Sequence, residues 1–183
     1  DLLTYSATVA NGTELPAWLN FNATMRTFTG TPDDAQVGNL DLRVTATDSG
    51  NLTVSNVFTL TVTNVNETPI VSKPLADQHA IEDAPFSFVV PTTTFTDQDT
   101  IHGDALTYSA TIAGGAVLPT WLSFNATTMT FSGIPLNGNV GLINLADKAT
   151  DTGGLNANST FTITVQNVND TPMVANLIPD QHA

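Results

Sequence analysis

The feature that most constrains this chain is an internal repeat with a fixed offset. The sequence Thr-Tyr-Ser-Ala-Thr at residues 4–8 returns at 107–111, and Leu-Pro-Ala-Trp-Leu at 15–19 returns as Leu-Pro-Thr-Trp-Leu at 118–122. Each pair lies 103 positions apart, and no insertion or deletion shifts this offset. Solenoid repeats run to roughly 20 to 50 residues, so a period this long predicts a tandem array of whole domains.

A polar segment that ends at a proline occurs at the end of each repeat. Residues 63–69 read Thr-Asn-Val-Asn-Glu-Thr-Pro, and residues 166–172 read Gln-Asn-Val-Asn-Asp-Thr-Pro; we name them joint 1 and joint 2. Asparagine and carboxylate oxygens are ligands that a hard cation such as Ca²⁺ prefers, and a proline stiffens the exit of the segment. The joints therefore predict metal-clamped connections between modules.

Short stretches of alternating apolar and polar residues predict half-buried β-strands. The alternation is strict at residues 40–44, 58–62, 86–90 and 106–112, and Gly, Asn, Asp or Pro residues separate the stretches. We therefore expect an all-β chain in which each repeat is a seven-stranded antiparallel β-sandwich. In the complete repeat the strands should lie near residues 71–80, 86–90, 106–112, 121–124, 129–132, 142–149 and 157–165.

The repeat boundaries predict three parts. Residues 1–69 should form a repeat that lacks its first two strands, 70–173 a complete repeat, and 174–183 the first strand of a following repeat. The core of the first repeat should be open along one edge unless another segment supplies the missing strands. We expect the sequence to be a window of a longer continuous array, and favour this over a polymer in which the tail of one copy joins the open edge of the next.

One position departs from the repeat. Val44, which faces inward by alternation, corresponds to Asp147 in the second repeat. A lone buried carboxylate would cost several kcal/mol. We therefore expect a bulge or a register change that turns Asp147 outward and exchanges it with Lys148.

Composition excludes some functions and favours others. Seventeen acidic residues against four basic ones give a net charge of −13, which argues against nucleic-acid binding and suits cation binding or simple solubility. The chain has no cysteine, so no disulfide stabilises it, and this favours a bacterial surface or secreted protein. The given sequence contains no apolar run of roughly 18 residues, the length that would predict a membrane-spanning helix. No nucleophile–base pair, phosphate loop or carboxylate dyad stands out, so we expect no catalysis.

The motifs around the two tryptophans carry a family resemblance. Residues 118–125 read Leu-Pro-Thr-Trp-Leu-Ser-Phe-Asn, Thr-Phe-Ser-Gly-Ile-Pro follows at 130–135, and the first repeat has counterparts at 15–22 and 28–32. This order resembles the dystroglycan-type cadherin-like domain, also described as the "putative immunoglobulin" repeat of large bacterial surface proteins. The resemblance covers essentially the whole chain. It implies tandem cadherin-like, immunoglobulin-like sandwiches, repeated head to tail in long adhesins or appended to secreted enzymes.

The resemblance also implies calcium at the joints, bound by groups from both flanking modules. Its implied ligands at joint 1 are Asn64, Asn66, Glu67, Asp97, Asp99 and Asp151. Its implied ligands at joint 2 are Glu82, Asn167, Asn169 and Asp170. The cadherin Asp-Arg-Glu segment has at best a weak counterpart at Asp33 and Asp34, which become Leu136 and Asn137 in the second repeat.

Charge crowding gives a separate argument for a cation. A sandwich of this topology should bring the loops that carry Glu67, Asp97, Asp99 and Asp151 to one pole. Close carboxylates repel by on the order of 1 kcal/mol per pair, and Ca²⁺ relieves this by taking roughly six to eight oxygens. The alternative is that these are solvated turn residues. His102, with His79 and His182, forms no plausible zinc cluster.

These observations favour a calcium-binding, non-catalytic repeat array that acts as a rigid spacer in a bacterial cell-surface adhesin or extracellular filament. The alternative is a carbohydrate-binding module of a surface protein or of a secreted polysaccharide-degrading enzyme. That alternative needs Trp18 and Trp121 exposed for sugar stacking, whereas a tryptophan between leucines is more often in the core. The expected partners are neighbouring repeats of the same chain, and candidate partners are cell-surface glycans and other copies of the chain.

Overall fold

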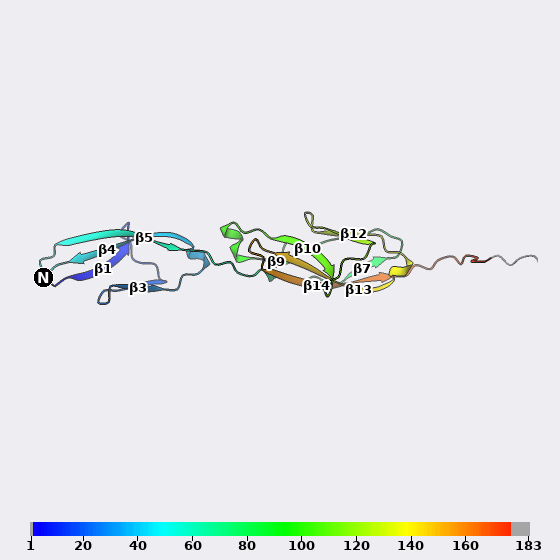
Figure 1. The fold of residues 1–183 in the computed structure, drawn as a ribbon, viewed down its shortest axis with the longest axis horizontal. Helices are drawn as coiled ribbons and strands as arrows, with labels where there is room; N and C mark the ends of the chain where they lie inside the picture. The colour runs from blue at the N-terminus through cyan, green and yellow to red at the C-terminus, as the bar shows by residue number, and fades with distance from the viewer. Residues whose placement is uncertain (1, 177–183) are drawn as a thin grey trace, which may run out of the picture. The chain divides into compact units, whose positions relative to one another are not determined.

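The computed structural model describes residues 2–176, and its contacts divide the chain into two units (Figure 1). Unit 1 comprises Asp1–Glu67 with Gln98–Gly103, and unit 2 comprises Thr68–Asp97 with Asp104–Ala183. The predicted strand at 174–183 falls largely on 177–183, outside the described residues. No helix in the described part is long and apolar enough to cross a bilayer.

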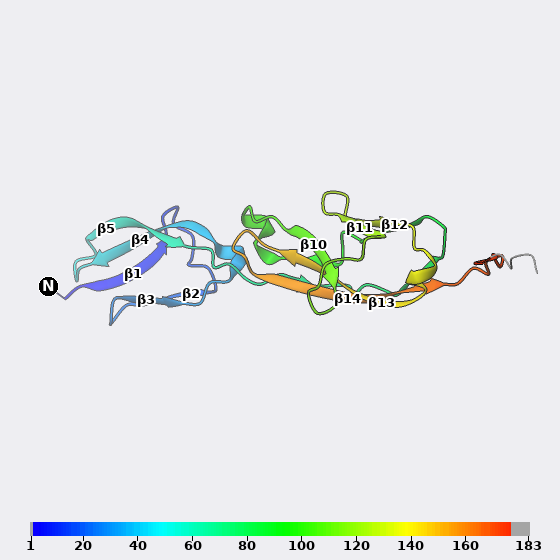
Figure 2. The ribbon, with the colours of Figure 1, turned by 45° about the vertical axis from the view of Figure 1, so that its right-hand side comes forward.

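Unit 1 is a two-layer sandwich (Figure 2). One layer is the antiparallel sheet β1–β4–β5, formed by β1 (Thr4–Val9), β4 (Gly38–Thr47) and β5 (Thr53–Val62). The other layer is the hairpin of β2 (Leu19–Asn22) and β3 (Thr27–Gly30). Two 3₁₀ turns complete the unit, η1 (Asp34–Gln36) and η2 (Gln98–His102).

Unit 2 contains the same layers and two further strands that close them. The larger sheet has the order β10–β13–β14–β7, with strands Thr107–Ile112, Gly141–Thr150, Asn156–Gln166 and Gln78–Ile81. The facing sheet has the order β11–β12–β8, with strands Leu122–Asn125, Thr130–Gly133 and Phe86–Val89. A short pair, β6 (Ile70–Val71) with β9 (Phe95–Thr96), and the turn η3 (Asn137–Asn139) complete it.

The predicted strand at 71–80 is in fact two strands in different sheets. β6 pairs with β9, and the chain then crosses over, with the Leu75 N–H donating to Ser159 Oγ at 3.1 Å. It continues as β7, which pairs with β14 in a parallel register from Gln78 opposite Ile163 to Ile81 opposite Gln166. The sandwich is therefore all-β as predicted, but one of its pairings is parallel.

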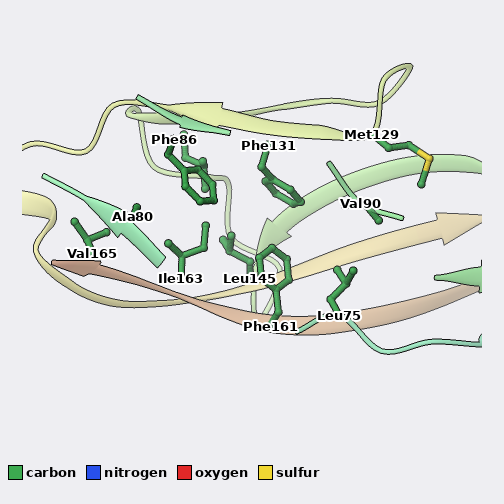
Figure 3. Packing of buried hydrophobic residues seen from close by; sticks show 11 residues of the cluster. Leu75, Ala80, Phe86, Val90, Met129, Phe131, Leu145, Phe161, Ile163 and Val165 are labelled. Atoms are coloured by element: carbon green, nitrogen blue, oxygen red, sulfur yellow. The ribbon is translucent and has the colours of Figure 1, made fainter. Parts of the chain in front are cut away.

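The core of unit 2 lies between its two sheets (Figure 3). Phe131, Leu145 and Ile163 are fully buried at its centre. The Phe131 ring lies 4.6 Å from Phe124 and 5.4 Å from Phe161, measured between centroids. Fully burying each such side chain contributes about 1.5 to 3 kcal/mol, and the aromatic pairs add to this.

Asp147 faces into this core, so the predicted bulge and the exchange with Lys148 are wrong. The register of β13 with β14 runs unbroken through Asp147 opposite Ser159, and Asp147 is 0% exposed. Neither of its carboxylate oxygens has a hydrogen-bond partner in the described part of the chain. A one-residue shift would turn Leu145 and Ala149 outward as well. One buried carboxyl group therefore costs less than losing the apolar face of the whole strand.

Gly133 explains why the Phe-x-Gly-x-Pro motif contains glycine. Gly133 pairs with Leu122 on one side and Phe86 on the other. A Cβ atom placed on it would lie 1.8 Å from the Trp121 carbonyl oxygen, and one on its counterpart Gly30 would lie 2.3 Å from the Trp18 carbonyl oxygen. The backbone at each glycine can lie this close to the tryptophan carbonyl group because glycine has no side chain to separate the two strands.

Substitution of this glycine should be costly. We expect Gly133→Ala to lower the free energy of unfolding of unit 2 by about 3 kcal/mol or more, because the added methyl group forces two strands apart. Gly138→Ala is the matched control, since a Cβ atom there meets nothing within 4 Å, and should change it by less than about 0.5 kcal/mol. Urea denaturation of both variants measures the difference; equal stabilities would contradict the steric account.

The buried carboxyl group predicts a pH-dependent stability. Burial raises the pKa of Asp147 to about 6, above its ordinary value of 3.8. The folded state then holds this proton more tightly than the unfolded state, so the stability of unit 2 should fall as the pH rises from about 4 to about 7, by roughly 2 to 3 kcal/mol.

Asp147→Asn should remove this fall, and Asp147→Val, which restores the residue found at Val44, should raise the free energy of unfolding at pH 7. Asp41→Asn is the control, because Asp41 is an exposed residue of β4. Denaturation curves from pH 4 to 8 test the prediction, and parallel profiles for wild type and Asp147→Asn would refute it.

Candidate metal sites

Joint 1 is tied to a buried aspartate within unit 1. Asp99, in η2, is 1% exposed. Its Oδ1 accepts a hydrogen bond from Asn64 Nδ2 at 2.7 Å, and its Oδ2 accepts one from the Glu67 backbone N–H at 2.7 Å. The structure therefore brings together three predicted ligands, Asn64, Glu67 and Asp99. Asn66 is exposed, and its Nδ2 lies 3.5 Å from the Glu67 carbonyl oxygen.

Three carboxylates gather beside this joint. Asp34, Glu67 and Asp99 each place an oxygen within 4.8 Å of the others, and we name them the acidic cluster. Such charges repel by on the order of 1 kcal/mol per pair when partly solvated. Ca²⁺ binds six to eight oxygens at about 2.3 to 2.6 Å, so carboxylates at this spacing fit part of its coordination shell.

Sequence reasoning gave little weight to two residues of this region, Asp34 and His102. His102 Nε2 lies 2.8 Å from Asp34 Oδ1, an ion pair when the imidazole is protonated. Asp34 is held by a capping box, in which the Ala35 N–H donates to Asp33 Oδ1 and the Asp33 N–H donates to Gln36 Oε1. The Asp-Asp-x-Gln sequence is a capping signal, and it could have located this carboxylate at a fixed turn.

Joint 2 carries a buried glutamate within unit 2. Glu82 is 1% exposed, and its Oε2 accepts the Val168 N–H at 2.9 Å. Its own N–H donates to the Gln166 carbonyl oxygen at 3.0 Å. The other oxygen, Oε1, is buried and has no hydrogen-bond partner among the described residues. A buried carboxylate oxygen without a donor is costly, and a bound cation would satisfy it.

The remaining ligands predicted for joint 2 are on the surface. Asn167, Asn169 and Asp170 are exposed. Asn137 Nδ2 lies 3.4 Å from Asp170 Oδ2 in hydrogen-bonding geometry. Asn137 and Asp170 are the repeat counterparts of Asp34 and Glu67. An amide therefore faces a carboxylate where unit 1 has two carboxylates, so joint 2 is less crowded with charge.

Asp97 and Asp151 belong to unit 2. Asp97 is half-buried after β9, and its carboxylate has an oxygen within 4.8 Å of one from Asp104. Asp151 is 5% exposed, and its Oδ1 accepts the Leu155 N–H at 2.8 Å in the β13–β14 turn. That these two side chains share a cation with Glu67 and Asp99 stays a prediction.

Sequence reasoning missed Asp104. Its Oδ1 accepts hydrogen bonds from the Thr152 hydroxyl and from the Thr152 N–H at 2.9 Å. These bonds lower the pKa of Asp104 below its ordinary value, and the bond from the Thr152 hydroxyl has the largest effect. Its repeat counterpart is Asp1, which lies outside the described residues.

The two tryptophans are half-buried. Trp121 packs against the core of unit 2, and its ring meets Phe86 edge-on at a centroid distance of 6.5 Å. Trp18 borders a groove in unit 1. These positions fit the core interpretation better than an exposed platform for sugar stacking.

The family model described as "Putative Ig domain" matches residues 1–63 and 68–166. The chain belongs to this family. The two matches are separated within joint 1, between residues 63 and 68, so the family model matches once in each sequence repeat. The finer assignment to the dystroglycan type stays a prediction.

Among curated proteins, the chain is 31% identical over 157 residues to the "Serine-rich adhesin for platelets" of Staphylococcus aureus strain USA300. The match covers 85% of this chain and 6% of the adhesin, so the chain spans a small part of that relative. The same adhesin of strain MRSA252 matches with the same identity, over 10% of its length. Neither the family description nor the name of this relative denotes an enzyme.

Solved cadherin structures share the fold. Protocadherin gamma B2 extracellular cadherin domains 1–5 match with a TM-score of 0.61 and 16% identity, over 91% of this chain and 34% of that one. Human mucin-like protocadherin EC1-2 matches with a TM-score of 0.56 and 17% identity, over 90% and 85% of the two chains. At this identity the likeness shows a cadherin-like, immunoglobulin-like sandwich architecture and nothing further.

Proposed function

We propose that this chain is a calcium-binding, non-catalytic pair of repeats that acts as a rigid spacer in a bacterial cell-surface adhesin or extracellular filament. The observation that carries the proposal is the acidic cluster of Asp34, Glu67 and Asp99 beside joint 1. Calcium held there would offset most of the charge of the three carboxylates and fix the joint, which already donates two hydrogen bonds to Asp99, one from the Asn64 side chain and one from the Glu67 backbone N–H.

The buried glutamate at joint 2 supports the same function. Glu82 already accepts the Val168 N–H, which fixes one carboxylate oxygen at the start of the joint. The second oxygen is then available to a cation, for which Asn167, Asn169 and Asp170 offer further oxygens nearby in sequence. Fewer carboxylates at joint 2 favour weaker binding there than at joint 1, because affinity follows ligand charge.

The relatives support a surface location. One is named as an adhesin, and the shared cadherin-like architecture suits repeated modules that extend a chain. In this proposal the partners are neighbouring repeats, each joint contributing ligands to a cation that both modules hold. The carbohydrate-binding alternative is less favoured, because Trp18 and Trp121 are half-buried.

Calcium binding is directly measurable. Isothermal titration of the calcium-free chain should show binding in the roughly 0.1 to 1 mM range of extracellular modules. Asp99→Asn removes one charge from the acidic cluster and should weaken binding at joint 1 by about tenfold or more, while Glu82→Gln should weaken joint 2 alone.

Asp41→Asn is the matched control, because it removes the same charge from an exposed position on β4, where Asp41 accepts the Thr59 hydroxyl. Its calcium affinity should equal that of the wild type. If the Asp99→Asn variant bound calcium as tightly as the wild type, joint 1 would not be a calcium site.

The spacer role predicts a change of stiffness. Small-angle scattering with saturating CaCl₂ should give a narrower distribution of interatomic distances than scattering in EDTA, because the cation couples the modules. The double variant Glu67→Gln, Asp99→Asn should give the EDTA profile in both conditions. Identical scattering profiles of the wild type with and without calcium would reject the spacer mechanism. They would not affect the result of the calcium titration.

A further inference from the structure

The chain contains two Asn-Gly sequences, Asn11-Gly12 in unit 1 and Asn137-Gly138 in unit 2. Asparagine is a chemically labile residue, because the backbone nitrogen of the following residue can attack its side-chain carbonyl carbon. Glycine favours this attack, since it has no side chain to crowd the nitrogen and leaves the backbone free to adopt the required geometry. The two sites differ in whether that nitrogen is already hydrogen-bonded.

At Asn11 the reacting groups are held apart by hydrogen bonds. The Gly12 N–H donates to the Val9 carbonyl oxygen at 2.9 Å. Asn11 Oδ1 accepts the Thr13 N–H at 3.0 Å and the Thr13 hydroxyl at 2.8 Å. Attack on this side chain would have to break the backbone bond and turn the amide group out of both of the others.

At Asn137 the attacking nitrogen is free. Asn137 and Gly138 are exposed residues of η3, and the Gly138 N–H has no hydrogen-bond partner in the part of the chain that the structure describes. In unit 1 the equivalent N–H, that of Ala35, donates to Asp33 Oδ1 at 2.9 Å. The counterpart of Asp33 is Leu136, which has no side-chain oxygen, so this bond is absent from η3.

Position 137 also has a charged counterpart in the other repeat. That counterpart is Asp34, whose carboxylate has an oxygen within 4.8 Å of one from Glu67 in the acidic cluster. The counterpart of Glu67 is Asp170, and Asn137 Nδ2 lies 3.4 Å from Asp170 Oδ2. A carboxylate at position 137 would therefore give unit 2 the acidic pair that unit 1 has beside joint 1.

The buried glutamate of joint 2 belongs to the same end of unit 2. The Asp83 N–H donates to the Pro135 carbonyl oxygen at 2.8 Å, which ties the turn that carries Glu82 to the segment that leads into η3. Glu82 Oε2 accepts the Val168 N–H, and Oε1 is buried without a hydrogen-bond partner among the described residues. This end of unit 2 therefore holds both a carboxylate oxygen that lacks a partner and the asparagine whose counterpart is an acid.

We propose that Asn137 is a deamidation site, and that its conversion to a carboxylate strengthens calcium binding at joint 2. The Gly138 nitrogen forms a bond to Asn137 Cγ, the Cγ–Nδ2 bond breaks, and ammonia leaves with the proton of the Gly138 N–H. Water then opens the cyclic imide at either carbonyl carbon, which gives aspartate or isoaspartate. The net reaction consumes one water, releases one ammonia and needs no oxidant or cofactor.

The inference rests on the calcium-binding function proposed above. Each product carries one new negative charge beside Asp170. Calcium affinity follows ligand charge, so joint 2 of an aged chain binds calcium more tightly than joint 2 of a new one. Deamidation thus brings joint 2 closer to the charge of joint 1.

Peptide mapping by mass spectrometry tests the chemical step. The full chain, incubated at mildly alkaline pH with EDTA, should gain at Asn137 the mass of an amide-to-acid exchange. Asn11 is the internal control and should react roughly two- to tenfold more slowly, the factor that one backbone hydrogen bond contributes. Gly138→Ala should slow the reaction and leave the fold intact, because a Cβ atom there meets nothing within 4 Å. An intact Asn137, or an equal or faster reaction at Asn11, overturns the proposal.

Calcium titration tests the consequence, in chains that carry Glu67→Gln and Asp99→Asn so that joint 1 does not contribute. Asn137→Asp places the product charge in a freshly prepared chain and should tighten calcium binding by about tenfold. Asn158→Asp is the matched control, because it adds the same charge at an exposed position near the start of β14, whereas joint 2 follows the end of that strand. Its affinity should equal that of the parent chain.

Ageing links the two tests. The parent chain should approach the affinity of Asn137→Asp as deamidation proceeds, whereas Asn137→Gln, which keeps an amide in a side chain that reacts more slowly, should keep the affinity of a new chain. If Asn137→Asp left the affinity unchanged while Glu82→Gln still weakened it, this inference alone would fall and the proposed function would stand. Absence of calcium binding in all of these chains and in the wild type would overturn both.

Discussion

Closure of each sandwich depends on whether a strand lies along the outer edge of the last long strand. In unit 2 the parallel pairing of β7 with β14 brings Ala80 over the core and leads the chain through Glu82 into β8. That single crossover buries Phe161 and Ile163 and also places a carboxylate at joint 2. Core and candidate metal site are therefore coupled, because the same dozen residues complete both.

Much of the fold follows from the sequence because alternation reports which face of a strand is buried. The fixed offset and the alternating stretches predict strands near 86–90, 106–112, 142–149 and 157–165, and the structure has a strand at each of these places. Alternation does not report a strand's direction, so the parallel β7 was not predicted. Reasoning from alternation also judges each position by itself, so Asp147 was expected to face outward. In the structure the nine other residue pairs of β13 with β14 fix the register of the strand, and this register places Asp147 inside.

The candidate site was predictable where its residues lie in a motif. Asn64 and Glu67 occur in a repeated segment, and the structure joins both to Asp99. Asp34 lies in a turn whose sequence is not repeated, because unit 2 has Asn137 there, and its proximity to Glu67 depends on how β3 leads into η1. Residues from different loops meet through tertiary structure, which local spacing does not encode.

The parallel pair of edge strands has a mechanical consequence. β7 lies early in unit 2 and β14 ends it, so a force that stretches the chain draws these neighbours in opposite directions along their length. Their hydrogen bonds then bear the load together in shear, which resists rupture better than peeling them apart one at a time. A tether built from such modules would yield first at any repeat in which this pair is missing.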